Sequence, residues 1–221
     1  MHPLLHDIRL VAFDLDGTLI DSVPDLAAAV DGMLVEQGFE PVGEARVRDW
    51  VGNGSRKLVE RALASVVGEA PDASLIEASH DHFLRHYHAA PCDQTRVYPG
   101  VREALDALEA EGFIVTLITN KPAAFIDPIL EALDLRRYFR TTLGGDSLPQ
   151  QKPHPAPLLH LATQYGVDPA QCLMVGDSRH DVEAGRRAGF RTLAVSYGYN
   201  HGEPVVSSRP DGVVESLREL V

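Results

Sequence analysis

Short apolar runs, spaced along most of the chain, are the clearest feature of the amino-acid sequence. Runs of this length that are rich in Val, Ile and Leu predict strands buried on both faces of a sheet. The stronger candidates are residues 8–13, 114–118 and 172–175, and the weaker ones are residues 141–143, 191–195 and 212–214.

Between these runs, apolar residues recur at the three- and four-residue spacing that is typical of amphipathic helices. The predicted helices are residues 101–110, 123–133, 155–165 and 181–188. Strands that alternate with helices indicate an α/β fold, in which a Rossmann-like parallel sheet is covered by helices on both faces. In sheets of this kind the chemistry gathers at the C-terminal ends of the strands.

A stretch from about residue 25 to residue 90 breaks this alternation, because it contains helical patterns and no convincing strand. The helices predicted there are residues 25–36, 54–66 and 73–87. A block of helices after the first strand reads as a small domain standing over the edge of the sheet. The sequence therefore predicts an inserted α-helical cap at residues 21–92, with an α/β catalytic core at residues 1–20 and 93–221.

The composition narrows the class of protein. With 221 residues, of which 44% are hydrophobic, the chain is long enough for one α/β domain and a smaller one. A formal net charge of −12 argues against non-specific binding to nucleic acids or anionic membranes. No apolar run reaches the length of a membrane span, and the first residues lack a signal-peptide layout. Because Cys92 and Cys172 give no disulfide framework, we expect a cytoplasmic protein with reduced thiols.

An acidic chain repels anions in general, so a site for an anionic ligand needs local cations. The chain has only three lysines, Lys57, Lys121 and Lys152, against seventeen arginines. A compact ammonium group is harder to replace in an active site than on a surface. Two of the three lysines lie in the polar segments considered next.

Two carboxylates follow the first predicted strand. Asp14 and Asp16 flank Leu15 and precede Gly17, and because strand residues alternate between faces, both acids point the same way. Like charges so close together repel, so they need a cation or a shared proton. The pair therefore favours a chemical role over two solvated turn residues.

Three further groups of polar residues lie where a parallel sheet would bring them to the same edge. They are Thr119 with Asn120, Lys152, and Asp177 with Asp181. Each alone has an ordinary explanation as a turn, a solvated lysine or a helix cap. Four such positions in one chain, in this order, indicate a single active site.

The order and spacing of these groups resemble the four motifs of the haloacid dehalogenase superfamily, and the resemblance covers nearly the whole chain. The inserted helical cap matches the same superfamily. Two segments, Trp50 to Gly54 and Tyr197 to Gly202, resemble segments of bacterial members that hydrolyse 2-phosphoglycolate. The resemblance implies a phosphatase of carbohydrate metabolism that acts on this small phosphorylated metabolite, as a monomer or a homodimer.

The resemblance also implies a role for each core residue, and these roles agree with the chemistry of phosphoryl transfer. Asp14 would attack phosphorus and form an aspartyl-phosphate, while Asp16 would protonate the leaving oxygen and later deprotonate water. Asp14, the backbone carbonyl of Asp16 and Asp177 would hold Mg²⁺. Asp181 is either an auxiliary carboxylate of the metal site or the N-terminal acid of the following helix.

The phosphoryl group needs hydrogen-bond donors and a positive charge on its oxygens. The catalytic residues expected to supply them are Thr119 and Lys152, and the expected substrate-binding residues of the core are Gly17, Thr18 and Asn120. A substrate carboxylate would need a further donor from the cap. The candidates left open are the backbone of Gly52 to Gly54, the side chain of Asn53, Arg56 and Lys57.

Other activities stay open at this stage. A phosphatase or phosphomutase for a sugar phosphate shares the four motifs and differs mainly in its cap. A haloacid dehalogenase would need neither Asp16 nor Asp177, and a phosphonatase would lack the second carboxylate. A receiver-like phosphate-sensing module also accepts phosphate on an aspartate, but it has no inserted cap, and Asp16 favours turnover.

Four histidines, His80, His82, His86 and His88, lie close together on one predicted helix of the cap. His82 and His86 have the i, i+4 spacing that can bind a transition metal. No third ligand is evident, so we expect a solvated helix face.

Overall fold

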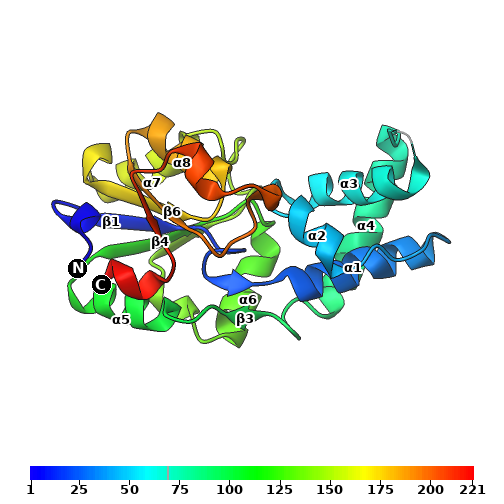
Figure 1. The fold of residues 1–221 in the computed structure, drawn as a ribbon, viewed down its shortest axis with the longest axis horizontal. Helices are drawn as coiled ribbons and strands as arrows, with labels where there is room; N and C mark the ends of the chain where they lie inside the picture. Colours follow the sequence, from blue (N-terminus) through cyan, green and yellow to red (C-terminus); the bar gives the residue numbers. More distant parts are fainter. Residues whose placement is uncertain (69) are drawn as a thin grey trace.

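The computed structural model of the chain describes residues 1–68 and 70–221 and contains the expected parallel sheet (Figure 1). Six strands form the sheet in the order β5-β4-β1-β6-β7-β8, and every neighbouring pair is parallel. The strands are β1 (Leu10–Phe13), β4 (Ile114–Ile118), β5 (Thr141–Leu143), β6 (Cys172–Gly176), β7 (Arg191–Val195) and β8 (Gly212–Val214). The predicted fold class is confirmed.

Helices cover both faces of this sheet, because successive residues of a strand point to opposite sides. Leu10 and Ala12 of β1 belong to one apolar cluster with α7 and α8, whereas Val11 and Phe13 belong to a second cluster with α5 and α6. Figure 1 shows the two pairs of helices on opposite sides of the strands. These helices are α5 (Val101–Ala110), α6 (Ile126–Ala132), α7 (Ala156–Tyr165) and α8 (Arg179–Ala188).

The central strand β1 determines where the predicted site residues meet. From β1 the chain builds β4 and β5 on one side and then crosses to β6, β7 and β8 on the other. The direction of winding therefore changes at β1, and ligands of open α/β sheets bind at such a switch point. The C-terminal ends of β4, β1 and β6, which carry three of the four predicted motifs, lie side by side.

Four helices form a separate group beside the sheet (Figure 1). They are α1 (Val23–Glu36), α2 (Glu44–Trp50), α3 (Ser55–Val67) and α4 (Ala73–Ala89). A short antiparallel pair, β2 (Ile20–Asp21) with β3 (Arg96–Val97), lies where the chain enters and leaves this group. The predicted domain limits lie beside this pair and stay a prediction.

The sequence pattern did not indicate α2 or the pair of β2 and β3. Helix α2 has seven residues and only one, Val47, is buried, so it lacks an apolar stripe long enough to recognise. Each strand of the short pair has two residues, which is too few to show alternation.

The apolar core of the four helices continues into that of the sheet. Phe83 and Tyr87 of α4 stack with ring centroids 5.7 Å apart, and Tyr87 contacts Phe125 at 4.8 Å. Phe125 lies in the segment between β4 and α6, so these rings join the cap to the core next to the end of β4. The position of the cap is thereby fixed by packing as well as by its two connections.

Short 3₁₀ turns complete the described elements. They are η1 (Pro3–Leu5), η2 (Ala123–Phe125), η3 (Arg136–Tyr138), η4 (Pro169–Gln171), η5 (Asn200–Gly202), η6 (Val205–Ser208) and η7 (Leu217–Leu220). Within the described part of the chain, we find no helix with the length and apolar character needed to span a bilayer.

Asp25, in the first turn of α1, ties the beginning of the cap to its end. Its buried carboxylate accepts hydrogen bonds from the backbone N–H groups of Gln94 and Thr95, at 3.0 and 2.7 Å, and from the Thr95 hydroxyl at 2.6 Å. Because Thr95 leads into β3, this single side chain links both connections between cap and sheet.

We expect Asp25→Ala to lower the free energy of unfolding by about 3 kcal/mol, since it leaves buried donors without an acceptor. Urea denaturation followed by circular dichroism measures this loss. Asp127→Ala is the matched control, because Asp127 forms an exposed ion pair with Arg136 and such pairs contribute about 1 kcal/mol or less. Equal losses in the two variants would show that Asp25 does not hold the cap.

Candidate active site

Asp14 lies directly after β1, where its backbone N–H donates to the carbonyl oxygen of Val175 in β6 at 2.9 Å. The loop that follows packs on Asp177. Gly17 has a φ of +87°, and a Cβ at this position would lie 2.3 Å from Oδ2 of Asp177, so only glycine fits here. The hydroxyl of Thr18 donates to Oδ1 of Asp177 at 3.3 Å. The first and fourth predicted motifs are therefore in direct contact.

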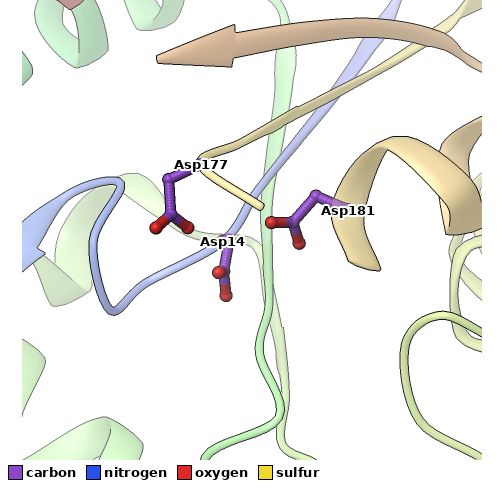
Figure 2. A group of neighbouring side chains, drawn as sticks. All are labelled: Asp14, Asp177 and Asp181. Atoms are coloured by element: carbon purple, nitrogen blue, oxygen red, sulfur yellow. The ribbon is translucent and has the colours of Figure 1, made fainter. Parts of the chain in front are cut away.

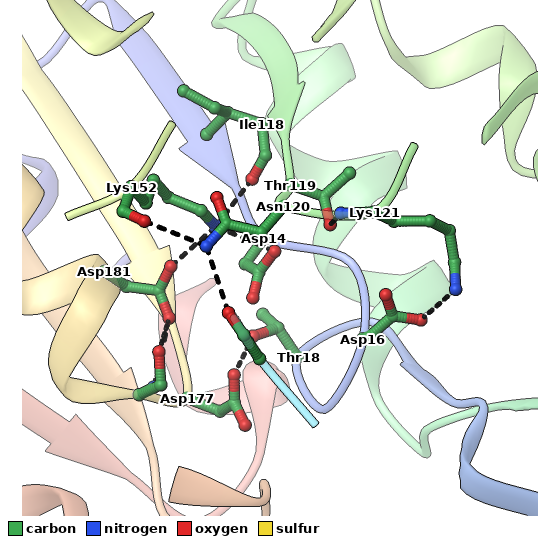
Figure 3. A network of polar contacts seen from close by, with 12 residues as sticks. Asp14, Asp16, Thr18, Ile118, Thr119, Asn120, Lys121, Lys152, Asp177 and Asp181 are labelled. Carbon is green, nitrogen blue, oxygen red and sulfur yellow. Dashed lines mark hydrogen bonds and ion pairs between the residues drawn. The ribbon is translucent and has the colours of Figure 1, made fainter. Parts of the chain in front are cut away.

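The ammonium group of Lys152 lies at the centre of the site (Figure 3). Its Nζ is 2.8 Å from Oδ1 of Asp14 and 2.7 Å from Oδ1 of Asp181, and it donates to the carbonyl oxygen of Ile118 at 2.8 Å. Burial alone would lower the pKa of Lys152, but the two carboxylates outweigh burial and hold this pKa above its ordinary value. Lys152 is thus a fully paired buried cation.

Three buried carboxylates, those of Asp14, Asp177 and Asp181, lie close together (Figure 2), and two of them, Asp14 and Asp181, contact this ammonium group. One oxygen of each lies within 4.8 Å of one oxygen of the others. Burial raises the pKa of Asp14 from 3.8 to about 7, although Lys152 acts in the opposite direction. Burial and repulsion from Asp181 and Asp14 raise the pKa of Asp177 well above its ordinary value. The cluster therefore holds more acidic groups than its one ammonium group can offset.

This cluster fits a divalent cation. Three carboxylates around one ammonium group leave two negative charges uncompensated in a buried place. Carboxylate oxygens are hard ligands of the kind that Mg²⁺ and Ca²⁺ prefer. Among the described residues, this is the only group of three neighbouring acid, histidine or cysteine side chains that could hold a metal ion. It contains Asp14 and Asp177, two of the predicted ligands, together with Asp181.

Asp181 caps the helix that follows it and also belongs to the acidic cluster. Its Oδ1 contacts Lys152, while its Oδ2 accepts from the backbone N–H and the hydroxyl of Ser178, at 3.0 and 2.7 Å. The contacts with Ser178 form a capping box at the start of α8. The helix begins at Arg179, two residues before the predicted start. Asp181 therefore orients the helix and contributes to the acidic cluster.

Thr119 and Asn120 follow β4 and complete the central part of the site. The hydroxyl oxygen of Thr119 accepts from the backbone N–H of Lys121 at 3.1 Å. The side-chain amide of Asn120 donates to the carbonyl oxygens of Lys152, at 2.9 Å, and of Gly52, at 3.0 Å. Asn120 thus links the loop that carries Lys152 to the cap (Figure 3).

Asp16 has its own cation, Lys121, which the sequence did not assign to the site. Its Oδ1 lies 3.0 Å from Nζ of Lys121 and accepts from the hydroxyl of Ser22 at 2.5 Å. Both contacts use Oδ1 of Asp16. The two predicted acids of the first motif are therefore paired with different lysines.

Tyr87 of the cap is a second residue that sequence reasoning missed. Its hydroxyl oxygen accepts from Nζ of Lys121 at 2.9 Å, and the same ammonium lies 4.8 Å from the centre of its ring. The scarcity of lysine was the available signal for Lys121, because it directly follows Thr119 and Asn120. No signal in the sequence marked Tyr87, which has the spacing of an ordinary apolar helix residue.

The structure places the predicted cap loop, residues 52–54, beside the site, but only some of its residues line the cavity there. Gly52 and Gly54 line a cavity of about 40 Å³ above Asp14 and Asp16. Asn53 is not among the lining residues, because its side-chain amide pairs with Nε2 of His180 at 2.7 Å and its oxygen accepts from Arg61 at 2.7 Å. The Asn53 side chain therefore holds the loop against α8.

The two cap cations that were candidates for a substrate carboxylate lie outside this cavity. Arg56 pairs with Glu77 at 2.7 Å, and Lys57 pairs with Glu60 at 2.6 Å. About half of each cationic side chain is exposed. Neither residue lines the cavity, so the described structure does not place them against a substrate.

The C-terminal segment from Tyr197 to Gly202 packs against the acidic cluster. The backbone N–H of Tyr199 donates to Oδ2 of Asp177 at 2.7 Å, and its hydroxyl donates to Asp21 at 2.8 Å. A Cβ on Gly198 would lie 2.1 Å from that of Asp177, so glycine is required for this approach. The segment thus fixes the orientation of the Asp177 carboxylate.

Two of the four histidines of α4, His82 and His86, face Glu36 of α1. Nδ1 of His82 and Nε2 of His86 lie 3.2 and 3.0 Å from the same carboxylate oxygen, and Arg85 pairs with the other at 3.0 Å. Hydrogen bonds from Arg85 and His86 lower the pKa of Glu36 to about 2. Among the described residues, these side chains do not form a cluster with three metal ligands.

The amino-acid sequence of the chain is similar to those of known proteins. Residues 11–195 match the family model described as haloacid dehalogenase-like hydrolase. The chain is 50% identical over 214 residues to the phosphoglycolate phosphatase of Pseudomonas putida, covering 96% of this chain and 78% of that protein. It is 43% identical over 217 residues to the phosphoglycolate phosphatase of Nitrosococcus oceani, covering 98% and 96%.

A solved structure matches the whole fold, including the cap. The crystal structure of a predicted phosphoglycolate phosphatase from Haemophilus somnus 129PT superimposes with a TM-score of 0.90 and 36% identity, over 97% of this chain and 96% of that one. The residues matched by the family model contain Asp14, Thr119, Lys152 and Asp177. The chain therefore belongs to the haloacid dehalogenase-like hydrolases, and its similarity to phosphatases of that family over most of its length makes it a phosphoric monoester hydrolase.

Proposed function

We propose that this hydrolase converts 2-phosphoglycolate to glycolate and phosphate, with Asp14 as nucleophile and Mg²⁺ as cofactor. The observation that carries the proposal is the buried group of Asp14, Asp177 and Asp181 around Lys152, which can accommodate a cation and a phosphate anion together. The substrate is inferred from the names of relatives that are 43% to 50% identical to this chain.

Asp14 would attack first. Lys152 holds Oδ1 of Asp14, so Oδ2 is available to form a bond to phosphorus. As that bond forms, the bond between phosphorus and the leaving oxygen breaks, and Asp16 gives its proton to the leaving oxygen. The products of this step are glycolate and an aspartyl-phosphate on Asp14.

Hydrolysis of the aspartyl-phosphate would follow in the second step. Asp16, now a carboxylate, accepts a proton from water while the water oxygen attacks phosphorus. The bond to Asp14 breaks, phosphate leaves, and both acids return to their first state. The hydroxyl of Thr119 would donate to a phosphoryl oxygen, while the positive charge of Lys152, whose N–H donors are paired with Asp14, Asp181 and the carbonyl oxygen of Ile118, would offset the negative charge around phosphorus.

Asp14, Asp177 and the backbone carbonyl of Asp16 would hold Mg²⁺, with Asp181 close by. When bound, the ion would offset the negative charge of the acids and of the phosphate. Mg²⁺ favours six oxygen ligands and retains waters, so three protein oxygens suffice.

The cap bounds the space beside Asp14 and Asp16 with Gly52, Gly54 and Tyr87. These residues would face the leaving group of the substrate. A phosphatase or phosphomutase for sugar phosphates is the second candidate, and a phosphate sensor is the third.

A comparison of substrates tests the proposal. We expect multiple turnovers, with kcat/KM for 2-phosphoglycolate exceeding that for glucose 6-phosphate by about tenfold or more. Phosphate release measured with each ester in the presence of Mg²⁺ gives both values. A preference for the hexose ester would support the second candidate, and a single turnover would support the sensor.

We expect Asp16→Asn to lower kcat by about a thousandfold, because an amide cannot donate or accept the proton. The phosphorylated form of Asp14 should then accumulate, since its hydrolysis also needs Asp16. Mass spectrometry after mixing with an activated ester detects the added phosphoryl group. Asp14→Asn is the matched control and should show neither turnover nor adduct, whereas an adduct in that variant would exclude Asp14 as nucleophile.

The raised pKa of Asp14 leads to a prediction on stability. Asp14 titrates near 3.8 in the unfolded chain and at about 7 in the folded, metal-free protein. The folded protein therefore binds the extra proton below pH 7, and the stability this provides is lost as the pH rises through 7. A divalent cation replaces that proton, so its binding should strengthen over the same range.

We accordingly expect Mg²⁺ to raise the Tm by about 4 °C or more near pH 8, and by less near pH 5. Differential scanning fluorimetry with Mg²⁺ or EDTA measures both shifts. Asp177→Asn should reduce the shift near pH 8, while the surface variant Asp127→Ala should keep it. A shift that is independent of pH and of Asp177 would place the cation elsewhere.

A further inference from the structure

We propose that Lys121 binds the carboxylate of the leaving group, and that it restricts the enzyme to phosphate esters whose alcohol carries a carboxylate on the adjacent carbon. This inference rests on the proposed function and identifies the residue that selects the substrate. Its basis is the position of one buried ammonium group between Asp16 and the cavity.

Lys121 is a buried cation on the leaving-group side of the site. It is 6% exposed, and its Nζ contacts Oδ1 of Asp16 at 3.0 Å and the hydroxyl of Tyr87 at 2.9 Å. The salt bridge with Asp16 and the hydrogen bond to Tyr87 hold this side chain as a buried ammonium group beside the cavity.

The two buried lysines differ in the number of N–H donors that remain without a partner. An ammonium group has three N–H donors. Lys152 directs its donors to Asp14, Asp181 and the carbonyl oxygen of Ile118. Lys121 has two partners in the described structure, Asp16 and Tyr87, which leaves one donor for a ligand. In Figure 3 the two ammonium groups lie on opposite sides of Asp14.

The remaining walls of the cavity offer little else to an anion. Lys121 is the only cationic residue among the described residues that line it. Two of its polar neighbours are engaged, because Ser55 pairs with His80 at 2.8 Å and the Asn120 amide donates to two carbonyl oxygens. The hydroxyls of Thr119 and Tyr87 also line the cavity, but they carry no charge. The apolar lining residues are Leu26, Val51, Leu58, Phe83, Pro122 and Phe125. Among the lining residues, Lys121 is therefore the one that can offset the charge of a buried carboxylate.

The distance between the leaving oxygen and the carboxylate of 2-phosphoglycolate fits the position of Lys121 beside Asp16. The leaving oxygen must lie within about 2.6–3.2 Å of the acid that protonates it, here Asp16. In 2-phosphoglycolate one CH₂ group separates that oxygen from the carboxylate carbon, a distance of about 2.4 Å by ordinary bond lengths. Since Nζ of Lys121 lies 3.0 Å from Asp16, the carboxylate falls within its reach.

The cap takes part in this selection through Tyr87. Tyr87 belongs to α4, while Lys121 follows β4 of the core, so their hydrogen bond crosses between the two parts. The Tyr87 hydroxyl holds the ammonium beside Asp16 only when the cap is in the position seen here. Selection of the carboxylate and closure of the cap are thereby linked.

Two esters of equal length test the inference. We compare kcat/KM for 2-phosphoglycolate with that for 2-hydroxyethyl phosphate, in which CH₂OH replaces the carboxylate. The wild-type ratio should favour 2-phosphoglycolate, and Lys121→Met should reduce the ratio by about 100-fold, since the buried carboxylate loses its partner. Lys121→Arg should restore part of the ratio. Lys57→Met, which changes an exposed cap lysine, is the control and should leave the ratio unchanged.

The outcomes separate this inference from other roles of Lys121. If Lys121→Met slows both esters by the same factor, Lys121 only positions Asp16 and the inference is wrong. If the ratio is unchanged, or if the wild type does not distinguish the two esters, it is wrong as well. Should Lys121→Met fail to fold, Lys121→Gln tests the same ratio with a polar side chain. A wild-type enzyme that ignores 2-phosphoglycolate but hydrolyses other esters would instead refute the proposed function.

Discussion

The ammonium group of Lys152 is the interaction on which the rest of the site depends. It binds Asp14, Asp181 and the carbonyl oxygen of Ile118, so it joins the end of β1, the start of α8 and the end of β4. Taking an unpaired charge out of water costs several kcal/mol, which is why three buried acids need this cation. It does not neutralise them, and the remaining negative charge is what makes the place suitable for a divalent ion.

Sheet topology explains why these distant residues meet. The winding changes direction at β1, so the ends of β4, β1 and β6 are adjacent, although Asp14 and Asp177 lie far apart in the sequence. Close approach then depends on small residues. Gly17 and Gly198 lie on either side of Asp177, and a Cβ on either would overlap its carboxylate or its Cβ. The Asp177 carboxylate, which belongs to the acidic cluster, is therefore also held in place by close packing against Gly17 and Gly198.

The sequence predicted the six strands of the sheet and the meeting of Asp14, Thr119, Lys152 and Asp177, because strand ends and glycine turns leave local patterns. It did not predict α2, whose buried surface is a single residue, or the two-residue strands β2 and β3. Lys121 and Tyr87 were missed for a different reason. Their roles come from a contact between α4 and the end of β4, and tertiary contacts of this kind leave no periodic signal.

Under the proposed function, the two buried lysines would serve the two ends of the substrate. Lys152 is saturated by Asp14, Asp181 and the carbonyl oxygen of Ile118, whereas Lys121 keeps one N–H donor beside Asp16. Net attraction for a dianionic or trianionic ester cannot come from the chain as a whole, which carries a formal charge of −12. It would have to come from these local cations and from a bound metal ion. Because the cap residue Tyr87 contacts Lys121, a cap that closes over the substrate would strengthen this attraction as water is excluded.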